Sequence, residues 1–223
     1  MKAIIFGASG MVGGGVLKEC LQALDVEQVL VVGRAPLGLQ HPRLKELVLA
    51  DLSDYTGHDA DLTGYDACFF CLGTSAAGKT EAEYRRITHD LTLAAARVLA
   101  RLNPQMMFIY VSGAGTDSTE RGRSMWARVK GQTENALQRL PLKAVYLFRP
   151  GLIRPMDGIV SKTPAYRVFY ALLSPLVALA HRAFPNQVLS TREIGQAMLQ
   201  LARRPSGPAV CEARDIRRAV PAR

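Results

Sequence analysis

A glycine-rich turn directly after a short apolar segment is the feature that most constrains how this chain folds. Residues 2–6 (KAIIF) are typical of a buried strand, residues 7–13 (GASGMVG) form the turn, and the residues that follow have the apolar spacing of a helix. Gly7 permits a tight turn, Gly10 lets the backbone approach a diphosphate, and Gly13 lets the helix pack closely against a sheet. The N–H groups and the positive end of the helix would then face the phosphates.

The alternative interpretation of this turn is a glycine loop without a ligand. A lone glycine triplet is a weak signal, but the strand before it and the helix after it favour phosphate binding. The spacing GxxGxxG differs from the GxGxxG of many dinucleotide-binding proteins. The residues that we expect to contact the phosphates are Gly7, Ser9, Gly10, Met11, Val12 and Gly13.

Short apolar segments alternate with helical ones through the first two thirds of the chain. The predicted strands are residues 2–6, 29–32, 47–50, 67–72, 107–111 and 144–148, and the longer predicted helices are residues 11–24, 81–102 and 124–140. Continuously apolar strands that alternate with helices indicate a parallel sheet covered on both faces. We therefore expect a doubly wound α/β fold with ligands at the carboxyl ends of the strands. With 48% hydrophobic and 21% charged residues, the 223-residue chain can form a core without disulfides.

The end of the second predicted strand bears on which dinucleotide is bound. Proteins that prefer NAD place an acidic residue there for the ribose hydroxyls, whereas this strand ends in Gly33-Arg34. A guanidinium pairs with a 2′-phosphate, so Arg34 favours NADP over NAD, unless it is simply an exposed loop arginine. Asp51 and Leu52, after the third strand, are expected to flank the adenine, although Asp51 is equally ordinary as a helix N-cap.

Three segments together carry a resemblance to a known family. They are the turn at residues 7–13, the segment Cys71-Leu72-Gly73-Thr74 after the fourth strand, and Ser112 after the fifth. We expect Cys71, Leu72, Gly73 and Thr74 to contact the cofactor. The chain resembles the short-chain dehydrogenase/reductase superfamily, and more narrowly its atypical, extended-like branch of NAD-dependent epimerase/dehydratase, NmrA-like and Tat-interacting oxidoreductase-like proteins. The resemblance is good over residues 2–155 and looser beyond. It implies a Rossmann-type domain over residues 1–155 and a small helical extension, residues 156–223, packed on the same domain.

The resemblance also implies a catalytic serine, a tyrosine, and a lysine four residues after the tyrosine. Ser112 and Lys130 occupy the serine and lysine positions, and the lysine would also hold the nicotinamide ribose. The tyrosine position holds Trp126, whose indole N–H donates a hydrogen bond but cannot exchange a proton as a phenol does. Since Trp126 and Lys130 are four apart, one helical face can direct both into one cleft; a core tryptophan and a surface lysine are the alternative.

The missing tyrosine leaves the source of the proton open. Lys130, Ser112, Thr74, a water molecule, or a tyrosine outside the motif are candidates; the last group comprises Tyr84, Tyr166 and Tyr170. We expect an NADP-dependent oxidoreductase or epimerase acting on a small carbonyl or hydroxyl compound. The alternative is a protein that senses the dinucleotide, or serves as a scaffold, without catalysis.

Positive charge is concentrated in the second half of the chain, and two cysteines lie close together in the fourth predicted strand. Residues 1–111 carry a net charge of −2 and residues 112–223 of +11, which indicates an anionic partner or a solvated basic face. No nucleic-acid-binding motif or metal-ligand spacing accompanies the charge, so we expect neither partner. Cys68 and Cys71 should lie on opposite faces of a strand rather than form a redox pair.

The alternation of strands and helices changes after the sixth strand. Residues 164–184 are expected to form a helical cap over the cleft; a membrane-surface helix is the alternative. Residues 191–203 have amphipathic helical spacing, and the basic tail from Pro205 is expected to be loosely held. We leave homo-oligomerisation open, and because the chain starts with a strand rather than a signal sequence, we expect a cytoplasmic location.

Overall fold

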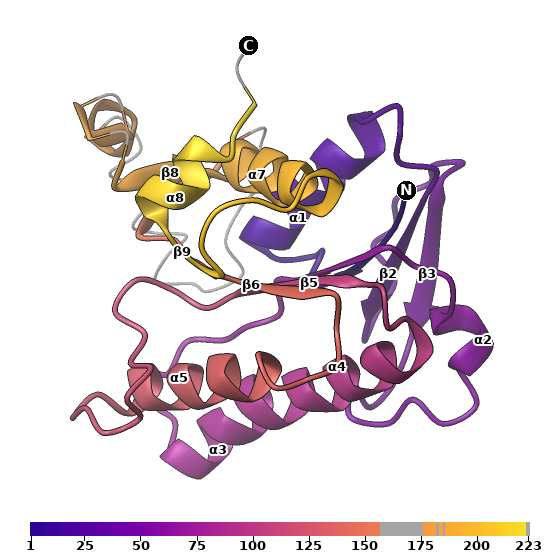
Figure 1. Ribbon diagram of the computed structural model, residues 1–223, viewed down its shortest axis with the longest axis horizontal. Helices are drawn as coiled ribbons and strands as arrows, with labels where there is room; N and C mark the ends of the chain where they lie inside the picture. Colours follow the sequence, from indigo (N-terminus) through magenta and orange to yellow (C-terminus); the bar gives the residue numbers. More distant parts are fainter. Residues whose placement is uncertain (157–175, 182, 185, 222–223) are drawn as a thin grey trace.

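Seven parallel strands form one sheet in the order β3-β2-β1-β4-β5-β6-β9, with helices on both faces (Figure 1). The computed structural model describes residues 1–156, 176–181, 183–184 and 186–221. The strands of this sheet are β1 (Lys2–Phe6), β2 (Gln28–Gly33), β3 (Leu44–Val48), β4 (Ala67–Phe70), β5 (Met107–Val111), β6 (Ala144–Arg149) and β9 (Val210–Glu212). The strand order reverses between β1 and β4, which is where α/β sheets of this kind bind ligands. The expected doubly wound fold is confirmed.

The helices divide between the two faces of the sheet. The helices are α1 (Met11–Gln22), α2 (Asp59–Leu62), α3 (Glu81–Arg85), a π-helical turn (Arg86–Asp90), α4 (Leu91–Leu102), α5 (Met125–Leu137), α7 (Thr191–Arg203) and α8 (Ala213–Arg218). Figure 1 shows α1, α7 and α8 on one side of the sheet, and α3, α4 and α5 on the other. A separate pair of short strands, β7 (Leu152–Arg154) and β8 (Val188–Ser190), runs parallel beyond the main sheet.

Alternate side chains of each central strand supply two separate cores. In β1, Ile5 packs beneath α1 and α7, whereas Ile4 and Phe6 pack beneath α4. Phe6 stacks on Phe70 with ring centroids 4.9 Å apart, and Phe70 stacks on Phe108 at 5.9 Å. Burial on both faces explains why these strands are apolar throughout rather than alternating.

The carboxyl-terminal tail differs from its prediction. We expected a loosely held segment from Pro205, but β9 pairs in parallel with β6, and α8 follows it. Cys211 and Ile216 are 2% and 0% exposed, so both belong to the core. The prediction was wrong because two buried side chains in a short basic segment give no periodic pattern.

Other predicted elements differ in extent, most clearly the third strand and the long helix before the fifth strand. The third strand is residues 44–48 rather than 47–50; it lies at the sheet edge, where half-exposed side chains blur the apolar pattern. The helix predicted over residues 81–102 is interrupted by the π-helical turn, which no residue type in that stretch signals.

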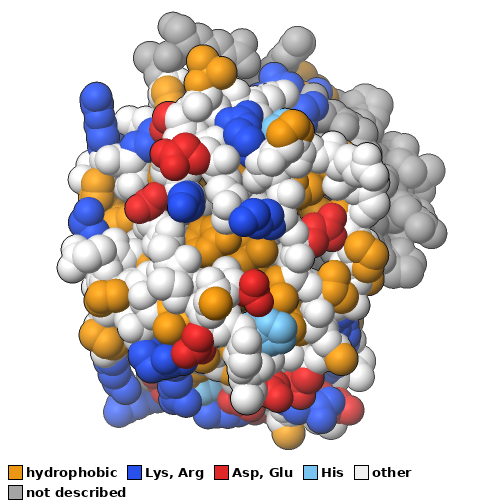
Figure 2. All heavy atoms as spheres, turned by 90° about the vertical axis from the view of Figure 1, so that its right-hand side faces the viewer, with side chains coloured by type: hydrophobic (Ala, Val, Ile, Leu, Met, Phe, Trp, Pro, Cys, Tyr) orange, Lys and Arg blue, Asp and Glu red, His pale blue; other side chains and the backbone are white. Residues whose placement is uncertain are grey.

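Most of the predicted cap over residues 164–184 lies outside the described residues. Within it, residues 176–181 are helical. Among the residues that the structure describes, no helix combines the length and apolar character needed to cross a bilayer. On the face shown in Figure 2, which looks onto the β3 side of the molecule, acidic and basic side chains are intermixed. The positive charge is therefore not concentrated on that face.

Close backbone contact joins α7 to α1. A Cβ atom on Gly15 of α1 would lie 2.8 Å from both the Cβ and the carbonyl oxygen of Thr191, the first residue of α7. The side chain of Glu19, one turn further along α1, accepts a hydrogen bond from Gln196 Nε2 at 3.0 Å. The helix that starts at the glycine turn is thus held from its outer side by the carboxyl-terminal part of the chain.

We predict that Gly15→Ala destabilises the protein by about 1–3 kcal/mol, because the added methyl group overpacks the contact with Thr191. This loss outweighs the gain of about 1 kcal/mol that alanine brings to a helix. Urea unfolding measures the difference. Gly73→Ala is the control, since among the described residues nothing lies within 4 Å of a Cβ there. Equal stability of Gly15→Ala and wild type would contradict the α1–α7 contact.

Candidate functional site

Three cavities adjoin along the carboxyl ends of the strands and meet at Leu72. The Arg34 cavity, about 630 Å³, is bordered by Arg34, the residues after β3 and the π-helical turn. The glycine-loop cavity, about 170 Å³, is bordered by residues 7–9 and the end of β2. The Lys130 cavity, about 440 Å³, is bordered by the start of α1, residues 71–75, the end of β5 and Lys130. Together they form one groove across the point where the strand order reverses.

The glycine turn has the backbone geometry that the sequence predicts. Gly7 has a φ of +78°, and a Cβ on it would lie 2.7 Å from the backbone of Cys71 and Leu72. A Cβ on Gly13 would lie 2.2 Å from the carbonyl oxygen of Gly7, so α1 packs directly on the turn. Among the described residues no side chain caps α1 at Gly10, and its first turn carries no acidic residue. These N–H groups therefore remain available for an anion.

The groove residues predicted for the adenosine end come together. Arg34 is exposed after β2 and lines both the Arg34 and glycine-loop cavities. Within the described part of the chain its side chain makes no ion pair or hydrogen bond that would hold it elsewhere. Asp51 and Leu52 lie across the Arg34 cavity, where Asp51 Oδ1 accepts hydrogen bonds from Ser53 N at 2.8 Å and Ser53 Oγ at 2.7 Å. The cavity is thus bordered by both basic and acidic side chains.

The π-helical turn supplies lining residues that sequence reasoning missed. Arg86, Ile87 and Asp90 belong to this turn and border the Arg34 cavity, as does Leu91 directly after it. A widened turn changes which side chains of a helix face a neighbouring cavity, and such turns are frequent at functional sites. Neither glycine nor proline marks the stretch, so the sequence offers no signal for it.

The Lys130 cavity brings together residues predicted for chemistry and residues predicted for cofactor binding. Met11, Val12 and residues 71–74 border it from one side, and Ser112 and Lys130 from the other. The Lys130 ammonium donates a hydrogen bond to the carbonyl oxygen of Ser112. Burial lowers the pKa of Lys130 to about 8, although the nearby Glu134 carboxylate opposes the shift. A lysine in this state exchanges protons near neutral pH.

A buried carboxylate, Glu134, contacts Ser112, which borders this cavity. Glu134 is 0% exposed, and Oε1 accepts a hydrogen bond from Ser112 Oγ at 2.5 Å. Arg149 donates to Oε1 through Nε at 3.1 Å and forms an ion pair with Oε2. The ion pair with Glu134 raises the pKa of Arg149, so that side chain is a permanent cation. Because a hydroxyl has one proton, Ser112 directs it toward Glu134 rather than into the cavity.

Trp126 lies apart from this group. Its ring packs beside Gly115, where a Cβ atom would lie 3.4 Å from Cη2, and it is not among the described residues that border the groove. The helix therefore places Lys130 in the cavity and the tryptophan against the loop that precedes the helix. Of the other tyrosines considered, Tyr84 is 2% exposed in the core, and Tyr166 and Tyr170 lie outside the described residues.

The cysteines take no part in the groove as a pair. Cys68 belongs to the core beneath α4 and Cys71 packs against the core beneath α1, so they lie on opposite faces of the sheet. All four cysteines are free, and burial raises the pKa of the Cys71 thiol to about 12. Within the part of the chain that the structure describes, no group of three His, Cys, Asp or Glu side chains is arranged to hold a metal ion.

Comparison with curated proteins identifies relatives at low identity. The protein fmp52-2 of Aspergillus oryzae is 28% identical over 153 residues, which cover 68% of this chain and 66% of that protein. The protein HTATIP2 of Rattus norvegicus is 27% identical over 151 residues, which cover 67% of this chain and 61% of that protein. The chain thus matches slightly less than two thirds of the length of these relatives. No family model matches the chain.

Solved structures share the fold. The Bordetella bronchiseptica enzyme WbmF, solved in complex with NAD+, has a TM-score of 0.66 and 16% identity, over 97% of this chain and 76% of WbmF. The UDP-N-acetylglucosamine 4-epimerase of Methanobrevibacter ruminantium has a TM-score of 0.68 and 16% identity, over 95% of this chain and 75% of the epimerase. The sheet and its flanking helices therefore have the arrangement found in NAD-binding, epimerase-type proteins.

The expectation of a cytoplasmic location is contradicted. The fmp52 relatives, including those of Aspergillus oryzae and Eremothecium gossypii, carry the description mitochondrial in their names. The prediction relied on the strand-like character of residues 2–6, which determines how this segment pairs in the sheet and not the compartment in which the protein resides.

The relatives and the fold agree with the motifs at residues 7–13, 71–74 and 112. They confirm the resemblance to the NAD-dependent epimerase/dehydratase and Tat-interacting oxidoreductase-like branch of the short-chain dehydrogenase/reductase superfamily.

Proposed function

We propose that this protein is an NADP(H)-dependent oxidoreductase that acts on a small carbonyl or hydroxyl compound, with Lys130 as its proton donor and acceptor. The observation that carries the proposal is the continuity of the groove. It runs from the guanidinium of Arg34 past the start of α1 to the ammonium of Lys130. These are the places where a 2′-phosphate, a diphosphate and a reacting carbonyl would need a positive charge or a donor.

The preference for NADP over NAD rests on Arg34. The residues that would hold the 2′-phosphate include no acid at the end of β2, and a guanidinium there offers several donors in one plane. Asp51 lies across the same cavity, but its carboxylate already accepts two hydrogen bonds from Ser53. Arg34 is therefore the group that would distinguish the two dinucleotides.

The proton chemistry follows from Lys130. When bound, a nicotinamide dinucleotide supplies or accepts the hydride. Lys130 Nζ, in its charged form, would give a proton to the carbonyl oxygen of the substrate as the carbon is reduced, and would take it back in the reverse direction. Its pKa of about 8 makes both directions accessible near neutral pH. Trp126 cannot replace it, since an indole donates a hydrogen bond without transferring its proton.

A non-catalytic dinucleotide sensor is the second candidate, and the tryptophan at the usual tyrosine position favours it. The two candidates share cofactor binding and differ in turnover. If NADPH binds and a panel of aldehydes and ketones is not reduced, the sensor is the better description. If the protein then captures the same partners with and without NADPH, the sensor fails as well.

We predict that Arg34→Ala weakens NADPH binding about tenfold or more and changes NADH binding little, because one charge-assisted contact to the 2′-phosphate is lost. Isothermal titration with both dinucleotides measures the difference. Arg97→Ala, an exposed arginine on α4, serves as the matched control and should bind both as wild type does. Equal losses for NADPH and NADH in Arg34→Ala would refute the assignment.

We predict that the kcat/KM of carbonyl reduction falls as pH rises through about 8, since the charged form of Lys130 is the proton donor. Lys130→Ala should lower kcat by ~10²–10⁴-fold. Lys130→Arg keeps the positive charge but cannot release the proton, so it should be as inactive. A pH–rate profile and the kcat of both variants check this, and a fully active Lys130→Arg would exclude Lys130 as the donor.

We predict that Glu134→Gln destabilises the protein by about 3–5 kcal/mol, because Arg149 loses its buried partner. The same change removes the charge that raises the pKa of Lys130, so in this variant the fall in rate should begin below pH 8. Glu212→Gln is the matched control, because Glu212 pairs with the same Arg149 at 3.4 Å from an exposed position. It should cost less than about 1 kcal/mol in urea unfolding. Similar losses in the free energy of unfolding for both variants would contradict the role of Glu134 as the buried partner of Arg149.

A further inference from the structure

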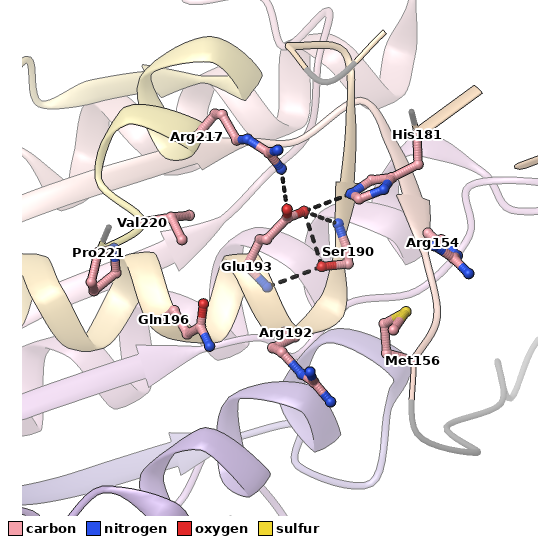
Figure 3. A pocket seen from close by; sticks show the side chains of 10 residues that line it. All are labelled: Arg154, Met156, His181, Ser190, Arg192, Glu193, Gln196, Arg217, Val220 and Pro221. Carbon is pink, nitrogen blue, oxygen red and sulfur yellow. Dashed lines mark hydrogen bonds and ion pairs between the residues drawn. The ribbon is translucent and has the colours of Figure 1, made fainter. Parts of the chain in front are cut away.

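A fourth cavity, about 530 Å³ in volume, lies among β7, β8, α7 and α8 and shares no lining residue with the groove (Figure 3). Its wall is rich in cations. Among the described residues, Arg154, Arg192 and Arg217 border it together with one carboxylate, Glu193, so these charged groups have a formal charge of +2 with His181 neutral. The proposed oxidoreductase activity uses none of these residues.

The carboxylate in the wall is already fully engaged. Glu193 Oε2 accepts hydrogen bonds from Ser190 N at 2.8 Å, from Ser190 Oγ at 2.9 Å, and from His181 Nε2 at 2.9 Å (Figure 3). Oε1 forms an ion pair with Arg217. Burial raises the pKa of Glu193, but the hydrogen bonds from His181 and Ser190 outweigh it and lower the pKa overall. An ionised carboxylate with four donors has no need of another cation.

Arg154 and Arg192 border the cavity outside that cluster, and they differ in their contacts. The side chain of Arg154 has no ion pair or hydrogen bond within the described part of the chain, and the register of Arg154 opposite Ser190 fixes it at the end of β7, beside the cavity. Arg192 is in the first turn of α7, where the helix dipole disfavours a cation, and its Nε lies 3.9 Å from Glu19 Oε1. A bound anion would give Arg154 the charged partner that the described residues do not supply, and would add to the contact that Arg192 has with Glu19.

We propose that this cavity binds the phosphate group of a small phosphorylated organic molecule, with Arg154 and Arg192 as its principal ligands. A phosphate monoester is close to a dianion at neutral pH and matches the charge of the wall. Arginine pairs with its oxygens through two parallel hydrogen bonds. Met156, Val220 and Pro221 border the same cavity and offer apolar contact to a carbon skeleton. The volume is within the range of small-molecule sites.

Isothermal titration of the full chain with glycerol 3-phosphate, inorganic phosphate and succinate at constant ionic strength tests the proposal. We expect saturable binding of glycerol 3-phosphate and of inorganic phosphate, both tighter than succinate. In Arg154→Gln the affinity for glycerol 3-phosphate should fall about tenfold or more. This variant should fold, since its side chain has no described partner to lose, and Arg192→Gln provides a second variant.

Two further variants separate this cavity from other sources of binding. Arg34→Gln alters the dinucleotide groove, and Arg97→Gln removes an exposed arginine from α4. Both should bind glycerol 3-phosphate as wild type does, whether or not the protein turns over NADPH. The proposal is overturned by absence of saturable binding in wild type, by unchanged affinity in both Arg154→Gln and Arg192→Gln, or by an equal loss in Arg34→Gln. Tighter binding of succinate than of either phosphate would also reject it.

Discussion

The contact between the start of α1 and the turn before it is the constraint on which the functional half of the structure depends. The carbonyl oxygen of Gly7 accepts a hydrogen bond from Gly10 N at 2.9 Å and lies where a Cβ of residue 13 would be. Any side chain at position 13 would move the helix away from the sheet. Because α1 is held this close, its uncapped N-terminus opens at the strand ends, between the Arg34 and Lys130 cavities. The groove is therefore formed by backbone packing, and its side chains determine which ligand it binds.

The buried carboxylate of Glu134 affects both the chemistry of the groove and the stability of the protein. Glu134 is fully removed from solvent, which is tolerated because Arg149 and Ser112 satisfy it. The same charge acts on Lys130 one helical turn earlier and keeps its pKa from falling further. The carboxylate of Glu134 therefore accounts for the orientation of the Ser112 hydroxyl and influences the pKa of Lys130, without a tyrosine in the motif. The tryptophan meanwhile packs on the loop at Gly115.

The sequence was most informative where a residue type has one physical reason to occupy its position. Glycines that need close approach, continuously apolar strands and a basic residue at the end of β2 led to the fold and to most of the groove lining. Features formed by distant or irregular backbone were not predictable. The π-helical turn at residues 86–90 follows from local hydrogen bonding within an otherwise ordinary helix. Strand β9 exists because β6 offers it an edge, and Glu134 is central because Arg149, on another element, reaches it.

The arginines of this chain fall into two groups: some pair with carboxylates, and others border cavities. Arg149 and Arg217 each face a carboxylate that is desolvated and depends on them, so they serve the fold. Arg34 and Arg154 stand beside cavities, and in the described residues neither has an acidic partner. In the two functions proposed above, the ligand brings the negative charge that these guanidinium groups face, and the two sites then differ in which anion they select.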